Sequence, residues 1–336
     1  MGAISRWAAQ SVARTLAWLK SNPHFRNLYA TLTYDEKNRE AFAQVDLQER
    51  MLADEVRFDA YRRAIAKHVH EGDTVLDVGT GSGILSFLAS GQRPGKIFAI
   101  DHSQIIEVAK LIADRNGVSN IEFRNVNSKD FQVSEKVDII LHEQIGDYLF
   151  SENMVASIVD LRERVLKEGG KILPAKFDLY MEPVQMKEEY RIPFIWEHRY
   201  QDIDYGCVKD FLREKNRDAH PPRVIQSHEV DHLLCEPERL FSCDLNTMSE
   251  ADLPNEFQSR KPALRDGRLD GFCLFFSVIF DGEISFSTFP SFKRTHWATP
   301  LFRVESRSCR KGDPLGFKLK IGDITNSNTW ILQPWD

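Results

Sequence analysis

Two glutamates nine residues apart, Glu143 and Glu152, are well placed to do chemistry together. They flank a loop containing Gly146 that follows the apolar run 137–141, and ligands of open α/β sheets bind at the carboxyl ends of strands. A turn at Gly146 would fold the two carboxylates towards one another. Adjacent carboxylates repel unless they share a proton or a cation, and a planar guanidinium donates hydrogen bonds in matching pairs. The alternative is a pair of unrelated surface glutamates.

A glycine-rich loop is the second chemical feature. Its glycines are Gly79, Gly81 and Gly83. The loop follows a strand-like run and enters a helix-like one, at a place where the backbone can approach a ligand closely. Asp77 puts a carboxylate beneath the loop, and Asp101 ends the next strand, where it suits a ribose diol.

Three interpretations of this loop compete. A dinucleotide site prefers G-x-G-x-x-G, and Asp77 would place negative charge beside the pyrophosphate. S-adenosylmethionine has no phosphate and carries a cationic sulfonium and ammonium, so the charges favour it as the cofactor. A structural turn without a ligand is the third interpretation. The pattern D-x-G-x-G-x-G resembles the class I methyltransferases, and no metal site is expected.

These loops need a scaffold, and four short apolar runs supply it. They are residues 75–78, 96–100, 137–141 and 171–173. The segments between them are long enough for helices, and an amphipathic helix over 55–68 precedes them. Short continuous apolar runs are typical of strands buried on both faces of a parallel sheet. The first half is therefore predicted to be a Rossmann-like α/β domain.

After Pro174 the sequence changes to alternating, strand-like stretches. They are residues 177–184, 273–280, 283–289 and 315–321. Turn signals such as Asp281-Gly282 separate them, which predicts an antiparallel all-β domain of the barrel or sandwich kind. Residues 187–222 are rich in aromatic and charged side chains and interrupt the pattern as an excursion.

Residues 228–232 fit H-E-x-x-H, the zinc-protease pattern, which requires both histidines on one face of a helix. Pro221 and Pro222 lie just upstream, and the surroundings suit strands. We interpret the match as a coincidence.

The composition excludes several classes of protein. The 336 residues are 42% hydrophobic and 28% charged, which is ordinary for a folded globular chain and corresponds to about two domains. The net charge of −6 gives no basic field for nucleic acid, and no apolar run is long enough to span a membrane. Five cysteines without a CxxC pair indicate a reduced, intracellular protein.

Residues 1–34 contain Arg6, Arg14, Lys20 and Arg26 but no acidic residue, and apolar residues recur there at helical spacing. This predicts a basic amphipathic helix. We interpret it as a helix packing on its own domain and expect a cytoplasmic protein; a mitochondrial presequence is the less favoured alternative.

Three separated motifs carry a closer resemblance. Segment 49–57 (ERMLADEVR) lies before the glycine loop, and residues 295–297 read Thr-His-Trp. Between them, five residues match the form S-E-x-x-G-Y-x-L-x-x-E-x-M: Glu143, Gly146, Leu149, Glu152 and Met154. These segments resemble the double-E loop and flanking motifs of the protein arginine methyltransferases, over residues 48–300.

The resemblance implies roles for single residues. Glu143 and Glu152 would hold the guanidinium of an acceptor, Arg57 the carboxylate of the cofactor, and His296 would pair with Asp54. The remaining cofactor-binding residues would be Met51, Asp77, Gly79, Gly81, Gly83, Asp101 and Ser128. The acceptor would contact Met154, Tyr148 and Trp297.

The match departs from the family near the acceptor. His142 replaces the first serine of the loop, Gln144 an aromatic residue, and Asp147 a tyrosine, with Tyr148 displaced by one position. These changes leave three possibilities open: an arginine-containing protein or peptide, free arginine or another small guanidino compound, and a catalytically silent cofactor-binding or scaffold protein.

We therefore predict an N-terminal helical segment (1–50), a Rossmann-like cofactor domain (51–175) and a β-barrel substrate domain (176–336). The resemblance implies that residues 187–222 form a helical dimerisation arm and that the protein is a homodimer. No nucleic acid or membrane is expected as a partner.

Overall fold

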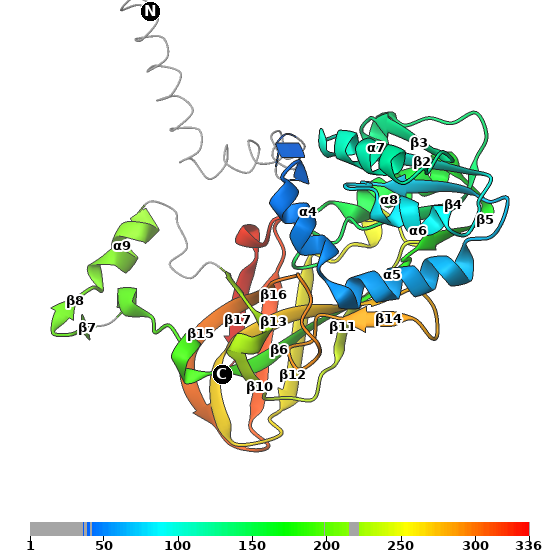
Figure 1. Cartoon of the computed structure of the whole chain (residues 1–336). Coiled ribbons are helices and arrows are strands. Elements are labelled where there is room, and N and C mark those ends of the chain that lie inside the picture. Colours follow the sequence, from blue (N-terminus) through cyan, green and yellow to red (C-terminus); the bar gives the residue numbers. More distant parts are fainter. Residues whose placement is uncertain (1–35, 37–38, 41, 198, 215–221, 336) are drawn as a thin grey trace, which may run out of the picture. The chain divides into compact units, whose positions relative to one another are not determined.

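The computed structural model describes residues 36, 39–40, 42–197, 199–214 and 222–335 (Figure 1). The chain divides into two compact units. One contains Ala43–Ile192 and His220–Asp336, and the other contains Met1–Phe42 and Pro193–Ala219. The basic amphipathic helix predicted within residues 1–34 lies outside the described residues. None of the described helices is long and apolar enough to cross a membrane.

Five parallel strands form the sheet of the larger unit, in the order β3-β2-β1-β4-β5. Their bounds are β1 Thr74–Val78, β2 Lys96–Asp101, β3 Ile121–Asn125, β4 Val137–His142 and β5 Leu166–Leu173. The predicted Rossmann-like sheet is confirmed. Because the strand order reverses between β1 and β4, the loops at their carboxyl ends diverge and leave room for a ligand.

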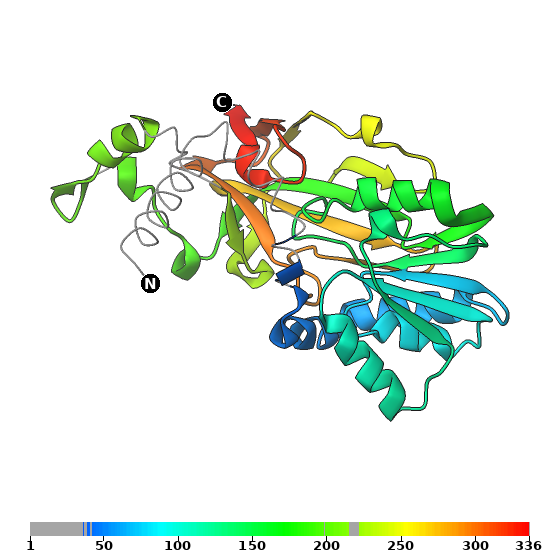
Figure 2. The ribbon, with the colours of Figure 1, turned by 90° about the horizontal axis from the view of Figure 1, so that it is seen from above.

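Helices α5 Glu55–His68, α6 Ile84–Ser90, α7 Ile105–Arg115 and α8 Met154–Val165 gather around this sheet, as Figures 1 and 2 show. Helix α4 Val45–Leu52 precedes α5 and stands further from the sheet. The structure confirms the helix predicted over 55–68. Asp54 caps it by accepting a hydrogen bond from Arg57 N at 3.0 Å, which satisfies one of the free donors of the first turn.

Strand β3 was not predicted. It is an edge strand that pairs with β2 alone, so its residues are half-buried and its apolar run is broken by Glu122 and Arg124. These polar side chains lie at the surface, where Glu122 pairs with Lys96 of β2 at 2.7 Å. An edge strand that is exposed on one side needs no continuous apolar run, so it lacks the pattern that is typical of a buried strand.

Antiparallel strands follow from Lys176 onwards. The larger sheet has the order β10-β6-β13-β15-β9, with β11 on β6 and β14 on β13, and a smaller one has the order β12-β16-β17. The bounds are β6 Lys176–Met186, β9 Arg223–Ile225, β10 Val230–Leu233, β11 Arg239–Asp244, β12 Glu256–Pro262, β13 Gly267–Ile279, β14 Ser285–Ser287, β15 Thr299–Cys309, β16 Pro314–Lys320 and β17 Ile331–Trp335. The predicted all-β barrel-like domain is confirmed.

Strand β14 is shorter than the predicted stretch 283–289. The Asp281 carboxylate accepts hydrogen bonds from the backbone of Glu283 and Ile284 at 2.8 and 2.9 Å. These two residues therefore belong to the turn before the strand.

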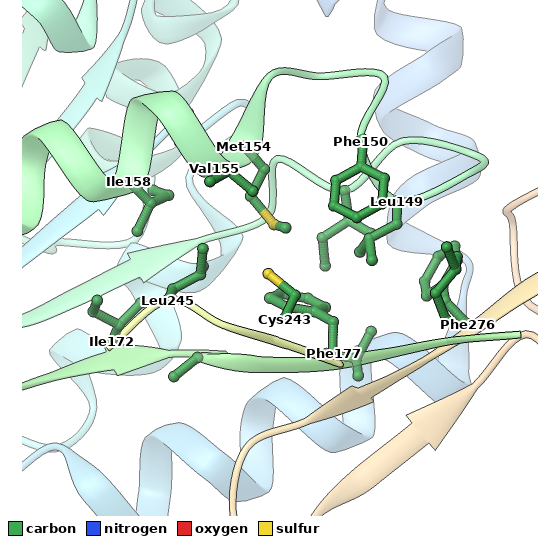
Figure 3. Packing of buried hydrophobic residues seen from close by; sticks show 14 of the residues in the cluster. Leu149, Phe150, Met154, Val155, Ile158, Ile172, Phe177, Cys243, Leu245 and Phe276 are labelled. Atoms are coloured by element: carbon green, nitrogen blue, oxygen red, sulfur yellow. The ribbon is translucent and has the colours of Figure 1, made fainter. Parts of the chain in front are cut away.

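The parallel sheet and the antiparallel strands share one hydrophobic core. Figure 3 shows Leu149, Phe150 and Met154, which follow β4, facing Phe177 of β6 and Phe276 of β13. All five side chains are at most 2% exposed. The loop between β4 and α8 is thus packed directly on the barrel-like domain.

The smaller unit has its own elements within residues 193–197 and 199–214. A 3-10 turn (Ile195–Glu197) precedes a hairpin of β7 (Arg199–Tyr200) and β8 (Ile203–Asp204), and α9 (Cys207–Glu214) follows. The rings of Trp196 and Tyr205 meet edge to face at 6.0 Å.

Candidate active site

The sheet topology brings the glycine loop and the first glutamate together. Val78, the last residue of β1, is the register partner of His142, the last residue of β4. Gly79 and Glu143 therefore leave the sheet side by side. Gln144 follows and lies over the loop, since its Cγ is 4.0 Å from where a Cβ on Gly79 would be.

Asp77 shapes the glycine loop from below. It is fully buried, and its Oδ2 accepts hydrogen bonds from the hydroxyls of Thr80 and Ser86 at 2.7 and 2.6 Å. Burial raises the pKa of Asp77 to about 6, although these hydrogen bonds oppose it. Its Oδ1 has no hydrogen-bond partner among the described residues, so an acceptor is left for a cationic or N–H group.

Asp101 ends β2 and holds the loop from the side. Its Oδ2 accepts a hydrogen bond from Gly81 N at 3.0 Å, and its Oδ1 accepts from the backbone and hydroxyl of Ser103 at 2.8 and 2.7 Å. The carboxylate is 7% exposed. Gly79, Gly81 and Gly83 all have positive φ, so these turns suit glycine.

Gln48 of α4 covers the same loop and was missed by the sequence analysis. A Cβ on Gly81 would lie 2.7 Å from Gln48 Oε1, which accepts a hydrogen bond from Ser82 N at 3.2 Å. Gln48 lies one turn before Met51 on the buried face of the helix. The burial of this polar side chain marks it in the structure, but a single glutamine in a helix gives no such signal in the sequence.

Arg57 links Met51 at the end of α4 to the first glutamate, Glu143. It is 4% exposed, its Nη1 lies 3.1 Å from Glu143 Oε2, and its Nη2 donates to the carbonyl of Met51 at 3.0 Å. Its Nε has no hydrogen-bond partner among the described residues. The structure thus places Arg57 and Met51 beside the first glutamate.

The loop between the two glutamates is a tight fold that Gly146 permits. Any Cβ there would come within 1.6 Å of the Ser151 hydroxyl, so only glycine fits. Leu149 N donates to the Gly146 carbonyl at 2.8 Å and closes the turn. Burial, the charge of Glu143 and the charge of Asp147 together raise the pKa of Glu152 well above its usual range. Glu143 and Glu152 therefore lie close enough for their charges to interact, and their joint role at an acceptor stays a prediction.

Residues 296–298 each bond to the α/β domain. His296 donates its backbone N–H to Asp54 Oδ2 at 2.8 Å, and its Nδ1 lies 2.9 Å from the same oxygen. Burial opposes ionisation of Asp54, but the hydrogen bonds from His296 and Arg57 hold its pKa below the ordinary value. The Ala298 backbone N–H donates to Asp147 Oδ1 at 2.9 Å. The predicted pairing of Asp54 with His296 is present.

Two of the three residues predicted to contact the acceptor, Met154 and Trp297, are more deeply buried than the glutamates. Met154 is 0% and Trp297 5% exposed, and the Trp297 indole donates to the carbonyl of Ile145 at 2.6 Å. Tyr148 is half-buried, and its hydroxyl donates to the carbonyl of Thr325. In this structure all three pack beneath or beside the loop.

His142 ends strand β4, and Ser128 follows strand β3. Burial lowers the pKa of His142 to about 4, so the ring is neutral at pH 7, and its Nε2 lies 2.8 Å from the carbonyl of Pro174. Ser128 begins a 3-10 turn after β3, and its carbonyl accepts from Arg164 Nη2 at 2.9 Å. Contact between Ser128 and a cofactor stays a prediction.

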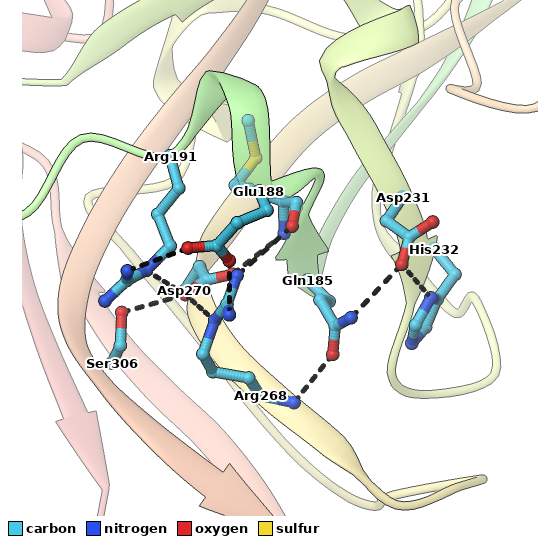
Figure 4. A network of polar contacts seen from close by, with 9 residues as sticks. Gln185, Glu188, Arg191, Asp231, His232, Arg268, Asp270 and Ser306 are labelled. Carbon is cyan, nitrogen blue, oxygen red and sulfur yellow. Dashed lines mark hydrogen bonds and ion pairs between the residues drawn. The ribbon is translucent and has the colours of Figure 1, made fainter.

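The H-E-x-x-H segment forms no helix that could present both histidines. Ser227–Glu229 is a 3-10 turn and Val230–Leu233 is strand β10. Figure 4 shows Asp231 between His232 and Gln185, at 3.0 and 3.1 Å. The interpretation as a coincidence agrees with this backbone.

Comparisons with known proteins fit this arrangement. Residues 69–210 match the methyltransferase domain family, and residues 175–321 match the arginine methyltransferase oligomerization subdomain. Protein arginine N-methyltransferase 6 of Xenopus laevis is 31% identical over 301 residues, 86% of each chain. Protein arginine N-methyltransferase 1 of Dictyostelium discoideum is 30% identical over 307 residues, 88% of this chain and 84% of that protein.

Solved structures share the fold. The Trypanosoma brucei PRMT1 enzyme-prozyme heterotetrameric complex with AdoHcy has a TM-score of 0.75 at 24% identity, covering 88% of this chain and 99% of that one. Protein arginine methyltransferase 10 of Arabidopsis thaliana has a TM-score of 0.74 at 24% identity, covering 88% and 93%. From its sequence relatives, its two matched domains and its motifs, this chain belongs to the protein arginine N-methyltransferase family.

Proposed function

We propose that this protein is an S-adenosylmethionine-dependent arginine N-methyltransferase that holds a guanidinium between Glu143 and Glu152. One observation carries the proposal: Glu152 lies near Glu143 and Asp147, and burial together with the charges of these two carboxylates raises its pKa well above the usual range. A planar cation that bonds to both glutamates would relieve this repulsion.

The residues around the glycine loop fit the proposed cofactor. The buried Asp77 Oδ1 lacks a partner, and Asp101 ends β2 beside the loop backbone. Carboxylates at both places suit a ligand with a cationic end and a ribose, and they disfavour a pyrophosphate. When bound, S-adenosylmethionine supplies a methyl group already activated for transfer by its sulfonium.

The chain's own residues would then act mainly by positioning and electrostatics. Glu143 and Glu152 localise the positive charge of the guanidinium away from the attacking nitrogen and aim its lone pair at the methyl group. Arg57 bonds to Glu143 on one side and would meet the cofactor's carboxylate on the other. The glutamates, or the pair of His296 and Asp54, accept the proton lost after transfer.

The proposal is tested in two steps. Calorimetry with S-adenosylmethionine comes first, because absence of binding would exclude any methyltransferase activity. Labelled cofactor is then incubated with arginine-rich peptides, free arginine and small guanidino compounds, and mass shifts of one methyl group are counted. Transfer to peptides supports the proposal. Transfer to the small molecules alone would mean that the acceptor is free arginine or another guanidino compound, and no transfer favours the scaffold alternative.

Asp101→Ala is predicted to weaken cofactor binding. A ribose hydrogen bond to a charged group contributes about 1.5–3 kcal/mol, so the Kd measured by calorimetry should rise roughly 10- to 100-fold. Ser103→Ala is the matched control, since it removes one donor to Asp101 and leaves the carboxylate. An unchanged Kd in Asp101→Ala would overturn this assignment.

We also propose a homodimer formed through the predicted dimerisation arm, residues 187–222. Trp196, Tyr200, Ile203 and Phe211 are 42–56% exposed there, which is unusual for so many large apolar side chains on one short segment. Light scattering should give about twice the 38.8-kDa mass of the chain, and Phe211→Asp should lower it to that of the monomer. A wild-type monomer would contradict the proposal.

A further inference from the structure

Tyr148, on the loop between the two glutamates, bonds to the far end of the chain. Its hydroxyl donates to the Thr325 carbonyl and accepts a hydrogen bond from Ser327 N at 3.3 Å. Its ring meets that of Trp330 edge to face at 5.3 Å. The match to the oligomerization subdomain ends at residue 321, so all three partners lie beyond it.

The partners belong to a well-bonded turn, residues 323–330, which we call the C-terminal turn. Asp323 Oδ1 accepts hydrogen bonds from the backbone and hydroxyl of Thr325 at 2.9 and 2.8 Å, and the Asp323 carbonyl accepts from the Trp330 indole at 2.8 Å. Thr329 Oγ1 bonds to Asp323 N and to the carbonyl of Asn326, both at 2.8 Å. The turn therefore presents the Thr325 carbonyl from a fixed position.

The loop that receives this contact carries backbone strain. Leu149, next to Tyr148, has φ +75°, and Asn153, next to Glu152, has φ +53°. Asparagine enters this left-handed region readily, but a bulky residue such as leucine occupies it only where its surroundings hold it there, so the strain lies at Leu149. Two features hold Leu149 in this conformation. Its side chain is buried in the core, and its neighbour Tyr148 is bonded to the Thr325 carbonyl.

We propose that Tyr148 is a positioning residue, through which the C-terminal turn holds the loop so that Glu152 faces Glu143. Burial raises the pKa of Tyr148 to about 12, so the hydroxyl keeps the proton that it donates to Thr325. Tyr148 acts on the loop and not on the acceptor. The catalytic consequence rests on the proposed function, whereas the effect on the loop does not.

Hydrogen exchange tests the effect on the loop without any acceptor. In Tyr148→Phe the ring contact with Trp330 is kept and the hydroxyl is lost. We expect the amides of Leu149 and Asn153, which bond to Gly146 and Phe150 carbonyls, to exchange about tenfold faster or more, with the rest of the α/β domain unchanged. Tyr180→Phe is the matched control, because it also removes a tyrosine hydroxyl from the barrel-like domain, where Tyr180 stacks on Phe275.

A second variant approaches the contact from its other side. Thr329→Val removes the hydroxyl that braces Asp323 and Asn326, and it should reproduce the faster exchange of Leu149. If both variants break the same contact, their combination should add little to either alone. Independent, additive effects would contradict the proposal.

Kinetics then separates positioning from simple loss of stability. In Tyr148→Phe we expect kcat/KM for the acceptor to fall roughly 10- to 100-fold while the Kd for S-adenosylmethionine stays within about twofold. Unchanged exchange at Leu149, or equal losses of cofactor and acceptor binding, would overturn the proposal. If the wild-type protein transferred no methyl groups, only the proposed function would be contradicted, because hydrogen exchange is measured without an acceptor.

Discussion

Glu152→Gln is expected to bind S-adenosylmethionine within a few-fold of the wild-type affinity and to transfer almost no methyl groups. Glutamine keeps the size of the side chain, but its neutral amide cannot balance the positive charge of a guanidinium. Removal of one electrostatic contact to a reacting group lowers kcat by a factor of about 10²–10³. Calorimetry measures the first quantity and label transfer the second. A variant that retained transfer would exclude Glu152 from the acceptor site.

The same substitution should stabilise the acceptor-free protein. The pKa of Glu152 is raised in the folded state, so its stabilising contribution is present at low pH, where the carboxyl is protonated, and is lost as pH rises. The neutral amide avoids this loss. The Tm of Glu152→Gln should therefore exceed that of the wild type by an amount that grows from pH 5 to pH 8.

Glu143→Gln is the matched comparison, because it should lose transfer equally while its stability changes in the opposite direction. Glu143 is the ion-pair partner of Arg57, which is only 4% exposed, so the substitution leaves a buried guanidinium without its counter-charge. Equal shifts in Tm for the two variants would contradict the different environments assigned to them.

The central strands and helices of the fold could be predicted because burial on both faces leaves a strong pattern. β1, β2 and β4 are nearly continuous apolar runs in the middle of the sheet, and the apolar residues of α5 recur at helical spacing. β3 was missed because an edge strand is only half-buried. Sequence patterns predict what is buried more reliably than what is merely hydrogen-bonded.

The arrangement of the candidate site could be predicted where it depends on side chains, and not where it depends on backbone atoms. Residue types and motifs predicted that Asp54 pairs with His296 and that Glu143 and Glu152 lie close together. The contacts that hold the loop use the carbonyls of Ile145 and Thr325 and the N–H of Ala298, and every residue type offers these groups. The partner of Tyr148 lies 177 residues away, and no local pattern encodes such a separation.

The net charge of −6 gives little information about partners, but the positions of the acidic residues in the structure give more. Glu143, Glu152 and Asp147 lie on one loop, and among the described residues Arg57 forms an ion pair with the first of them, Glu143, at 3.1 Å. Asp147 also bonds to Ala298 N, and burial raises its pKa. The excess negative charge is thus concentrated where a cationic acceptor would enter.

The largest effect on stability is expected at the buried ion pair of Glu182 and Lys261, far from the loop in sequence. Lys261 Nζ of β12 lies 2.5 and 2.6 Å from the two carboxylate oxygens of Glu182 in β6, and it donates to the carbonyl of Glu236 at 2.8 Å. Glu182 is 0% exposed and the Lys261 side chain 13%. The pair joins the larger antiparallel sheet to the smaller one.

Lys261→Met should lower the free energy of unfolding by about 3–5 kcal/mol, because it leaves Glu182 buried without its counter-charge. Burial already raises the pKa of Glu182 to about 7 despite the lysine. Since the folded pKa lies above the usual 4.5, stability from this group is present below about pH 4.5 and is lost as pH rises through 7. The loss in the variant should therefore be greater at pH 8 than at pH 6, as denaturant unfolding can measure.

Two further variants decide whether this ion pair holds the sheets together. Lys318→Met breaks a pair with Glu256 that is one-third exposed, and it should cost less than about 1 kcal/mol. Glu182→Gln combined with Lys261→Met removes both charges and should recover much of the stability lost in the single variant. If Lys261→Met cost no more than Lys318→Met, the two sheets would be held by apolar packing such as that of Phe272 on Phe317, whose rings are 5.1 Å apart, and the charged pair would be incidental to the fold.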